Sequence, residues 1–361
     1  MAKNKKTKNW HIQIDKGIIS VADLEIAFKK RNIKKSPKFY KDIENVSDVF
    51  PMRISPYTFK LCLNSKAIRR QFIPDKKELI VTRKTDKDPL NEDVTMPVKS
   101  LIHVYPDRVL LLATDMCFSF CRFCTRKRFK RKYTKISPEN LEKACRYIAE
   151  NKQIRDVIIS GGDPLTLEDS DLKRILEKIK KIKNVKTIRI GTRAPFSCPR
   201  RITDNLIKIL KSFYPLYINV HFNHPDEFTP ESTRVLKKMS SAGIILGNQS
   251  VLLEGINDSE KTMKELFYKC LDSGVKPYYL YQCDEVLGTE HFWTDYQKIF
   301  KIANKLIGNI SGLAVPNFVF DCGKGHGKVR ILPDFIESRD EKSITFKNFK
   351  NRKYTYRNLN K

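Results

Sequence analysis

Long hydrophobic runs are missing from this sequence of 361 residues. No stretch of about eighteen apolar residues is present, which excludes an ordinary membrane-spanning helix. The first eight residues are basic and lack the apolar stretch of a signal peptide. The nine cysteines are odd in number and mostly scattered, which suits a reducing compartment better than a disulfide framework. We therefore expect a cytoplasmic protein that has no contact with a membrane.

Negative charge is also scarce, because 70 Lys and Arg residues face only 41 Asp and Glu residues. The resulting formal charge of +29 could indicate a nucleic-acid partner, since basic residues bind phosphates. The lysines are nevertheless spread along the chain and interleaved with acids, as in residues 171–178. No basic stripe interleaved with aromatics and no nucleic-acid motif is present. The charge therefore favours solvated surfaces over a nucleic-acid interface.

A fourth cysteine is missing from the most informative segment of the chain. Cys117, Cys121 and Cys124 follow the spacing C-x3-C-x2-C. A structural zinc site takes four protein ligands, and ordinary iron–sulfur clusters are held by four cysteines. Three thiolates would leave one iron of a four-iron cluster open to another ligand. The spacing therefore predicts a [4Fe–4S] cluster with one open coordination site.

Short apolar runs alternate with amphipathic helices from residue 108 onward. We expect strands at 109–114, 156–160, 186–191, 216–222, 244–247 and 277–282. Helices such as 138–151 and 230–241 lie between them, each opened by a Ser or Thr cap and a proline. Six such units imply a parallel sheet but are too few for an eight-stranded barrel. The sequence thus predicts an α/β fold, a partial (β/α)6 TIM-like barrel with its chemistry at the carboxyl ends of the strands.

Different patterns flank this barrel, which we place at residues 101–310. Residues 1–100 are predicted to be helical and irregular, with a helix over 20–32. Residues 311–361 contain a glycine-rich loop and a β-rich extension, in which 343–356 alternates like a hairpin.

Two glycine-containing segments are suited to ligand binding. Gly161, Gly162 and Asp163 end the second strand, where exposed amides could hold an amino-acid headgroup, although a simple turn fits equally well. The loop 321–328 alternates three glycines with two lysines and suits an anion such as a phosphate. A lysine beside such a loop is typical of pyridoxal phosphate sites, but the spacing does not distinguish the two lysines.

Charged residues at strand ends suggest a substrate. Asp284 and Asp321 end two strands and, facing one cavity, would attract a distal ammonium, although either could cap a helix. Arg122 and Arg126 lie at the cysteine loop and suit bidentate binding of a carboxylate, although the positive charge crowded just downstream also favours a solvated surface.

These residues together resemble the lysine 2,3-aminomutase family of radical S-adenosylmethionine enzymes. The resemblance covers about residues 90–335, and its landmarks are Tyr105 to Val109, Cys117 to Phe129, Ser160 to Asp163, His221 to Pro225, Leu246 to Leu253, Pro277 to Tyr279, and Asp321 with Lys328.

The resemblance implies roles for the matching positions. Three residues would ligate the [4Fe–4S] cluster: Cys117, Cys121 and Cys124. Five residues would contact S-adenosylmethionine: Gly161, Gly162, Asp163, His221 and Gln249. Lys328 would carry pyridoxal 5′-phosphate. Three residues would bind the substrate carboxylate: Arg126, assisted by Arg108 and Arg122. Asp284 and Asp321 would hold the ε-ammonium group of lysine.

The activity implied is that of an isomerase that converts L-lysine to L-β-lysine. A 5′-deoxyadenosyl radical would start the 1,2-migration of the α-amino group. A reductant such as flavodoxin or ferredoxin would supply the electron, and the protein would form a homo-oligomer. The alternatives are an arginine 2,3-aminomutase, an aminomutase that acts on elongation factor P, and a basic iron–sulfur protein that binds nucleic acid without catalysis.

The chain departs from the family pattern at several positions. Zinc-binding members carry a cysteine where Ser259 stands, and no cysteine follows Cys322, so we expect no zinc. Val104 replaces an arginine that is usual before the tyrosine of the first landmark. If that arginine contacts the cofactor phosphate, Lys324 or His326 would have to compensate; otherwise the change would alter the choice of substrate.

Overall fold

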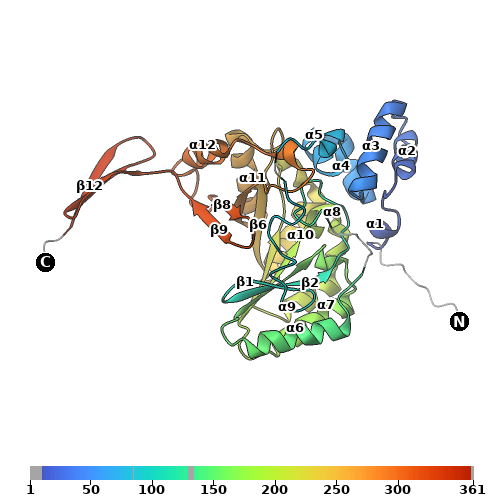
Figure 1. Ribbon diagram of the computed structural model, residues 1–361, viewed down its shortest axis with the longest axis horizontal. Helices are drawn as coiled ribbons and strands as arrows, with labels where there is room; N and C mark the ends of the chain where they lie inside the picture. The colour runs from blue at the N-terminus through green and yellow to red at the C-terminus, as the bar shows by residue number, and fades with distance from the viewer. Residues whose placement is uncertain (1–9, 84, 129–133, 359–361) are drawn as a thin grey trace.

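The computed structural model describes residues 10–83, 85–128 and 134–358. The basic first eight residues and Phe129, the last residue of the landmark that begins at Cys117, lie outside this part of the chain. Within it, none of the helices has the length and apolar character needed to cross a membrane. Figure 1 shows a barrel-like body with the N-terminal helices on one side and a small separate sheet on the other.

A nine-stranded sheet forms the body, and its strands follow one another in chain order. They are β1 (Leu101–Tyr105), β2 (Arg108–Thr114), β3 (Asp156–Gly161), β4 (Thr187–Thr192), β5 (Leu216–Val220), β6 (Ile245–Leu252), β7 (Lys276–Gln282), β8 (Asn317–Cys322) and β9 (Gly327–Ile331). Strands β2 to β8 run parallel, whereas β1 and β9 are antiparallel edges. The expected partial barrel is confirmed, and β8, the strand that we expected to end at Asp321, is a seventh parallel strand beyond the six units that we counted.

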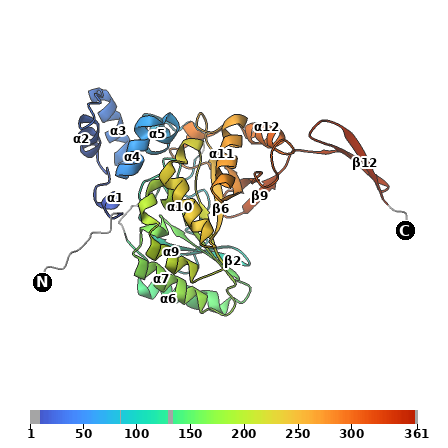
Figure 2. The ribbon, with the colours of Figure 1, turned by 180° about the vertical axis from the view of Figure 1, so that it is seen from behind.

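Helices connect the parallel strands and cover the outside of the barrel, as Figures 1 and 2 show. They are α6 (Pro138–Glu150), α7 (Asp169–Lys180), α8 (Ala194–Ser197), α9 (Asp204–Lys211), α10 (Pro230–Ser241), α11 (Glu260–Asp272) and α12 (Tyr296–Leu306). Single 3-10 turns lie between them at η2 (Pro164–Thr166), η3 (Pro199–Arg201), η4 (Pro225–Glu227) and η5 (Glu290–Phe292). Ser137 and Thr229 accept backbone N–H bonds as caps of α6 and α10, as the sequence predicted.

Helices also build the segment that precedes the barrel. They are α1 (Ile12–Asp15), α2 (Val21–Lys29), α3 (Pro37–Val49), α4 (Pro56–Asn64), α5 (Lys66–Phe72) and the 3-10 helix η1 (Lys76–Leu79). The helix that we expected over 20–32 ends earlier, because Asn32 has a φ of 56°, which a right-handed helix cannot accommodate. Buried residues of this segment, such as Trp10 and Phe59, belong to the same hydrophobic core as the barrel strands.

The N-terminal helices also hold the cysteine loop. The backbone N–H of Phe120 donates to the carbonyl of Arg53 at 2.8 Å, and that of Arg122 donates to the carbonyl of Gln71 at 2.9 Å. The side chain of Ser119 accepts from the backbone of Ser55 at 2.9 Å. We predicted no chemical role for residues 1–100; in the structure they fix the loop that carries the three cysteines.

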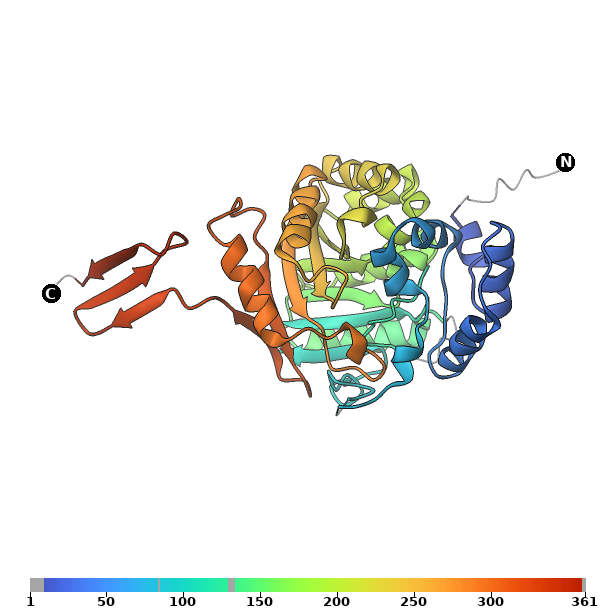
Figure 3. The same ribbon diagram turned by 90° about the horizontal axis from the view of Figure 1, so that it is seen from above.

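A second, three-stranded sheet follows the barrel and stands apart from it (Figure 3). It consists of β10 (Ile336–Arg339), β11 (Ser343–Lys347) and β12 (Lys353–Arg357), all antiparallel. The hairpin β11–β12 matches the alternation that we noted over 343–356. Large apolar side chains of this sheet are exposed, among them Phe346, Tyr354 and Tyr356.

Candidate active site

A cavity of about 590 Å³ lies inside the barrel, and its wall runs from Arg108 and Asp156 at the amino ends of β2 and β3 to His221 and Asp284 beyond the carboxyl ends of β5 and β7. Residues from β1 and β2 at one edge of the sheet and from β7, β8 and β9 at the other line the same space. Seven of the residues that we singled out from the sequence lie in its wall: Arg108, Arg126, His221, Gln249, Asp284, Asp321 and Lys328. The fold therefore gathers positions that lie more than 200 residues apart in the chain.

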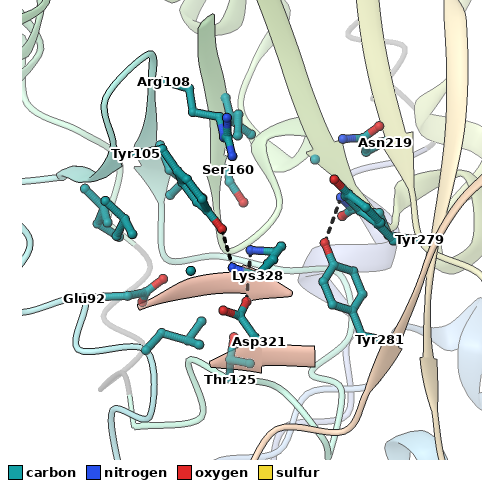
Figure 4. Close-up of a pocket in the computed structure, with 18 of the residues that line it drawn as sticks. Glu92, Tyr105, Arg108, Thr125, Ser160, Asn219, Tyr279, Tyr281, Asp321 and Lys328 are labelled. Atoms are coloured by element: carbon teal, nitrogen blue, oxygen red, sulfur yellow. Dashed lines mark hydrogen bonds and ion pairs between the residues drawn. The ribbon is translucent and has the colours of Figure 1, made fainter. Parts of the chain in front are cut away.

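Lys328 and Asp321 face one another in this cavity (Figure 4). The glycine-rich segment forms the turn between β8 and β9, and the strand register places these two residues directly opposite each other. Lys328 Nζ lies 2.9 Å from Asp321 Oδ2. Burial acts to lower the pKa of Lys328, but the carboxylate of Asp321 outweighs it, so the pKa is raised.

The open side of the barrel is bridged next to this ion pair. The backbone N–H of Lys328 on β9 donates to the hydroxyl of Tyr105 on β1 at 2.8 Å, and Figure 4 shows this bond. Gly327 has a φ of +83°, and a Cβ there would lie 3.1 Å from the same hydroxyl. A glycine at 327 thus allows β9 to approach β1 and turns Lys328 toward the cavity.

Asp284 follows β7 and forms the second acid of the cavity. Burial and then the nearby Asp321 carboxylate raise the pKa of Asp284 to about 7, while Lys328 acts in the opposite direction. Two carboxylates therefore share one cation, which leaves an excess of negative charge in the half-buried wall of the cavity. Such a site is suited to a further cation.

Lys324, the other lysine of the glycine-rich segment, lies elsewhere. It lines a neighbouring cavity of about 870 Å³, which shares Asp284 and Asp321 with the first. Its backbone N–H donates to the carbonyl of Pro89 at 2.7 Å. The sequence spacing did not distinguish the two lysines; in the structure it is Lys328 that lines the 590 Å³ cavity and pairs with Asp321.

Tyrosines form a part of the wall that our sequence analysis did not assign to the site. Tyr278, Tyr279 and Tyr281 of β7 all line the cavity. Gln249 Nε2 donates to the hydroxyl of Tyr281 at 3.4 Å, and burial raises the pKa of Tyr281 well above its ordinary value. Tyr279 and Tyr281 have the i, i+2 spacing that places two side chains on one face of a strand. This spacing could have predicted from the sequence that both lie in the wall.

The arginines of the cysteine loop have different surroundings. Arg126 lines the cavity and binds Glu92 through two bonds, from Nε to Oε2 at 3.0 Å and from Nη2 to Oε1 at 2.7 Å. Glu92 lies in an irregular segment, where no sequence pattern marked it. Arg108 lies in the same wall, with its guanidinium 3.7 Å from the ring centre of Tyr105.

Arg122 does not line the cavity, so our expectation that it contacts the substrate carboxylate is wrong. Its side chain is buried and donates to both oxygens of Glu78, at distances from 2.6 to 3.1 Å. It also donates to the carbonyls of Pro51 and Phe50, at 2.9 and 3.3 Å. These partners occupy the guanidinium, and they anchor the cysteine loop to the N-terminal helices.

The three cysteines lie half-buried on this anchored loop. Burial raises the pKa of the Cys121 thiol, and a bond of 2.8 Å from Arg193 Nη1 to Sγ acts against that rise. Among the described residues, no three His, Cys, Asp or Glu side chains converge as ligands of a single ion would. A cubane cluster needs a different arrangement, because each cysteine ligates its own iron. Three thiols on a fixed loop beside a buried cation fit that requirement.

Gly161 and Gly162 join the end of β3 to the cysteine loop. Gly162 N–H donates to the carbonyl of Thr114, and Asp163 N–H donates to that of Met116, both at 2.6 Å. A Cβ at either glycine would lie 2.2 Å from one of these carbonyl oxygens, so only glycine fits. Asp163 is buried, and its carboxylate already accepts bonds from three protein donors: Leu165 N–H, Thr192 Oγ1 and Arg193 N–H.

His221 offers a free ring nitrogen beside this region. Its Nε2 is buried and has no hydrogen-bond partner among the described residues. Its ring stacks on Phe123 of the cysteine loop, with 5.6 Å between ring centres. Burial lowers the pKa of His221 well below its ordinary value, so the ring is neutral. An unpaired nitrogen in the cavity wall fits contact with a bound S-adenosylmethionine.

Comparison with known proteins decides the family. The chain is 42% identical to an L-lysine 2,3-aminomutase of Methanococcus maripaludis, and the match covers 97% of this chain and 82% of that protein. The chain belongs to the lysine 2,3-aminomutase family. The family descriptions that match are the Radical SAM superfamily over residues 111–267 and Lysine-2,3-aminomutase over residues 303–361.

Other aminomutases match over similar lengths. The L-lysine 2,3-aminomutase of Clostridium subterminale is 41% identical over 96% of this chain and 83% of that protein. A glutamate 2,3-aminomutase of Clostridioides difficile is 38% identical over 88% of this chain and 76% of that protein. As a member of the aminomutase family, the protein is an isomerase that uses a [4Fe–4S] cluster, S-adenosylmethionine and pyridoxal phosphate. Membership overturns the alternative of a non-catalytic nucleic-acid-binding protein.

Proposed function

We propose that this aminomutase converts L-lysine to L-β-lysine. The observation that carries the proposal is the acid pair, because Asp284 and Asp321 line the same cavity as Lys328. Two carboxylates carry more negative charge than Lys328 alone can offset. A substrate with a distal ammonium would then restore the balance, whereas a substrate with a distal carboxylate would be repelled.

The other ends of the substrate and the cofactors have candidate partners in the same wall. Arg126 is proposed to bind the substrate carboxylate and Arg108 to assist it, since both line the cavity. Glu92 already occupies the Nε and Nη2 edge of Arg126, so the substrate would meet its remaining N–H groups. Pyridoxal phosphate would be held by Lys328 and would supply a conjugated imine that stabilises the radical while nitrogen shifts from Cα to Cβ of the substrate. Val104 offers no charge to its phosphate.

The cluster and S-adenosylmethionine have proposed partners on the cysteine loop and in the cavity wall. Cys117, Cys121 and Cys124 are proposed as the ligands of the cluster, which supplies an electron for radical formation. His221 and Gln249 are proposed to contact S-adenosylmethionine, because both line the cavity. Gly161, Gly162 and Asp163 are assigned a less direct role: they fix the strand end on the cysteine loop, and the carboxylate of Asp163 has its partners within the protein.

The partners and location follow from more general features. We propose a small electron carrier such as flavodoxin or ferredoxin as reductant and a cytoplasmic location, in keeping with nine free cysteines. A homo-oligomer is proposed because the sheet β10–β12 stands apart from the body and exposes Phe346, Tyr354 and Tyr356.

Substrate choice can be tested directly. The protein is reconstituted anaerobically with iron, sulfide, pyridoxal phosphate and S-adenosylmethionine, and lysine, arginine and glutamate are supplied in separate reactions. We expect β-lysine from lysine, with little product from glutamate. Turnover of arginine or glutamate without β-lysine formation would overturn the substrate assignment. Borohydride reduction followed by peptide mapping should fix pyridoxal phosphate on Lys328; a label on Lys324 would contradict its assigned role.

A further inference from the structure

Arg193 follows β4 and directs a buried guanidinium group at one of the cysteines. Its Nη1 donates to Cys121 Sγ at 2.8 Å, and the residue is only 9% exposed. A charged donor on a thiolate is a strong hydrogen bond, and its effect is larger where water is excluded. Arg193 is therefore the nearest cation that the described residues offer to this sulfur.

The guanidinium is held in place from several directions. Its Nη2 donates to Gln71 Oε1 at 2.7 Å and to Glu227 Oε2 at 3.0 Å. The rings of Phe72 and Phe196 lie 4.7 and 5.0 Å from its central carbon. These contacts come from the N-terminal helix α5, from α8 and from η4, so Arg193 cannot turn away without disturbing three elements.

One further donor of Arg193 has no partner. Its Nε is buried without a hydrogen bond in the part of the chain that the structure describes. An unsatisfied buried donor is costly and is commonly satisfied by a ligand. His221, the other residue here with an unpaired buried nitrogen, lies close enough for the charge of Arg193 to lower its pKa. Arg193 Nε and His221 Nε2 therefore have no hydrogen-bond partner among the described residues, and a ligand could bind both.

We propose that Arg193 positions Cys121 and raises the midpoint potential of the [4Fe–4S] cluster. A positive charge and N–H donors at cluster sulfurs stabilise the reduced state, which carries one more negative charge. Glu227 moderates this effect, because its buried carboxylate lies against the same guanidinium. The inference rests on the proposed role of the three cysteines as cluster ligands.

The test is a redox titration of the reconstituted protein, followed by electron paramagnetic resonance without substrate. We expect Arg193→Gln to lower the midpoint potential by at least 59 mV, a tenfold change in the ratio of reduced to oxidised cluster. Arg193→Lys keeps the charge and should shift it less. Glu227→Gln removes a negative charge and should shift the potential upward, opposite to Arg193→Gln.

Arg201 provides a matched control. It is also fully buried, but it forms an ion pair with Asp169 and donates hydrogen bonds to the carbonyls of Leu165 and Leu167. Arg201→Gln should lower thermal stability and leave the potential unchanged. An equal shift in Arg201→Gln, or an unshifted potential in a loaded Arg193→Gln, would overturn the inference.

Two further outcomes are decisive. If Arg193→Gln does not fold, the sign of the Glu227→Gln shift decides, and the absence of an upward shift overturns the proposal. If the wild-type protein assembles no cluster, both this inference and the proposed function fail. If the wild type assembles its cluster and cleaves S-adenosylmethionine while Arg193 has no effect on the potential, only this inference fails.

Discussion

Two groups of charged side chains, one closed and one open, differ in their balance of cations and anions. In one, Glu78 is bound by both Arg122 and Lys127, and none of the three side chains is more than 5% exposed. In the other, Asp321 and Asp284 share the single cation of Lys328, whose side chain is 31% exposed. The first group is closed and has more cations than anions, whereas the second is open and has more anions.

The surroundings of the two groups explain what each can do. Burial would raise the pKa of Glu78, but Arg122 and Lys127 outweigh it and the pKa is lowered. The pKa of Asp284 is instead raised to about 7. A carboxylate that is stabilised in its charged form by the protein has no need of a ligand. A carboxylate that is destabilised in that form gains when a cation binds.

The largest effect should come from Lys328, the one cation of the open group. We expect Lys328→Ala to lower β-lysine formation by at least about 10³-fold, because the anchor of pyridoxal phosphate is lost. The fold should persist, since the side chain borders a cavity. Activity, cofactor absorbance and the thermal midpoint would be measured together. Lys324→Ala, the matched control, should stay within a few-fold of wild type; an equal loss there would contradict the distinction between the lysines.

The closed group should respond through stability. Glu78→Gln leaves two buried cations without their carboxylate, so we expect the free energy of unfolding to fall by about 3–5 kcal/mol. Denaturant unfolding of the unloaded protein would measure it. Glu25→Gln, which breaks an exposed i, i+4 pair with Lys29, should leave the unfolding midpoint unchanged. A Glu78 variant as stable as wild type would show that the closed group is not structural.

Arg122 shows where sequence reasoning stops. Spacing predicted the cysteine loop, the strands β2 to β7 and the caps of α6 and α10, because these depend on local patterns. The partner of Arg122 depends on a contact with Glu78, 44 residues away, which only the packing of η1 on the loop creates. The acid pair could be predicted from the sequence because the carboxyl ends of parallel strands lie at one edge of a sheet. The carbonyls of Gln71 and Arg53 hold the cysteine loop, but no local sequence pattern marked these two residues.

Asp321 should affect the substrate more than the fold. Asp321→Asn removes one carboxylate from the open group, and we expect the KM for lysine to rise about 10- to 100-fold, since a bond to a charged group contributes about 1.5–3 kcal/mol. Steady-state kinetics at saturating cofactors would measure this. Asp204→Asn, at an exposed acid on α9, should leave KM unchanged. An unaltered KM in Asp321→Asn would remove this residue from the substrate site.

Asp284 should produce the smallest effect, one that depends on pH. Its pKa rises from 3.8 to about 7 on folding, so between these values the folded protein holds a proton that the unfolded chain releases. The free energy of unfolding should therefore fall as the pH rises through this range, and Asp284→Asn should remove that slope.

The same ionisation should influence binding in the opposite direction. Only the charged form of Asp284 attracts the ammonium group of lysine, which remains protonated at neutral pH. We therefore expect the KM for lysine to fall as the pH rises from about 6 to 8 and to become nearly independent of pH in Asp284→Asn. Unfolding and kinetics would be measured at the same pH values with both proteins. The wild type and the variant could show equal pH slopes of unfolding free energy and of KM. In that case Asp284 would not be the carboxylate with the raised pKa, and only Asp321 would remain to contrast with Glu78.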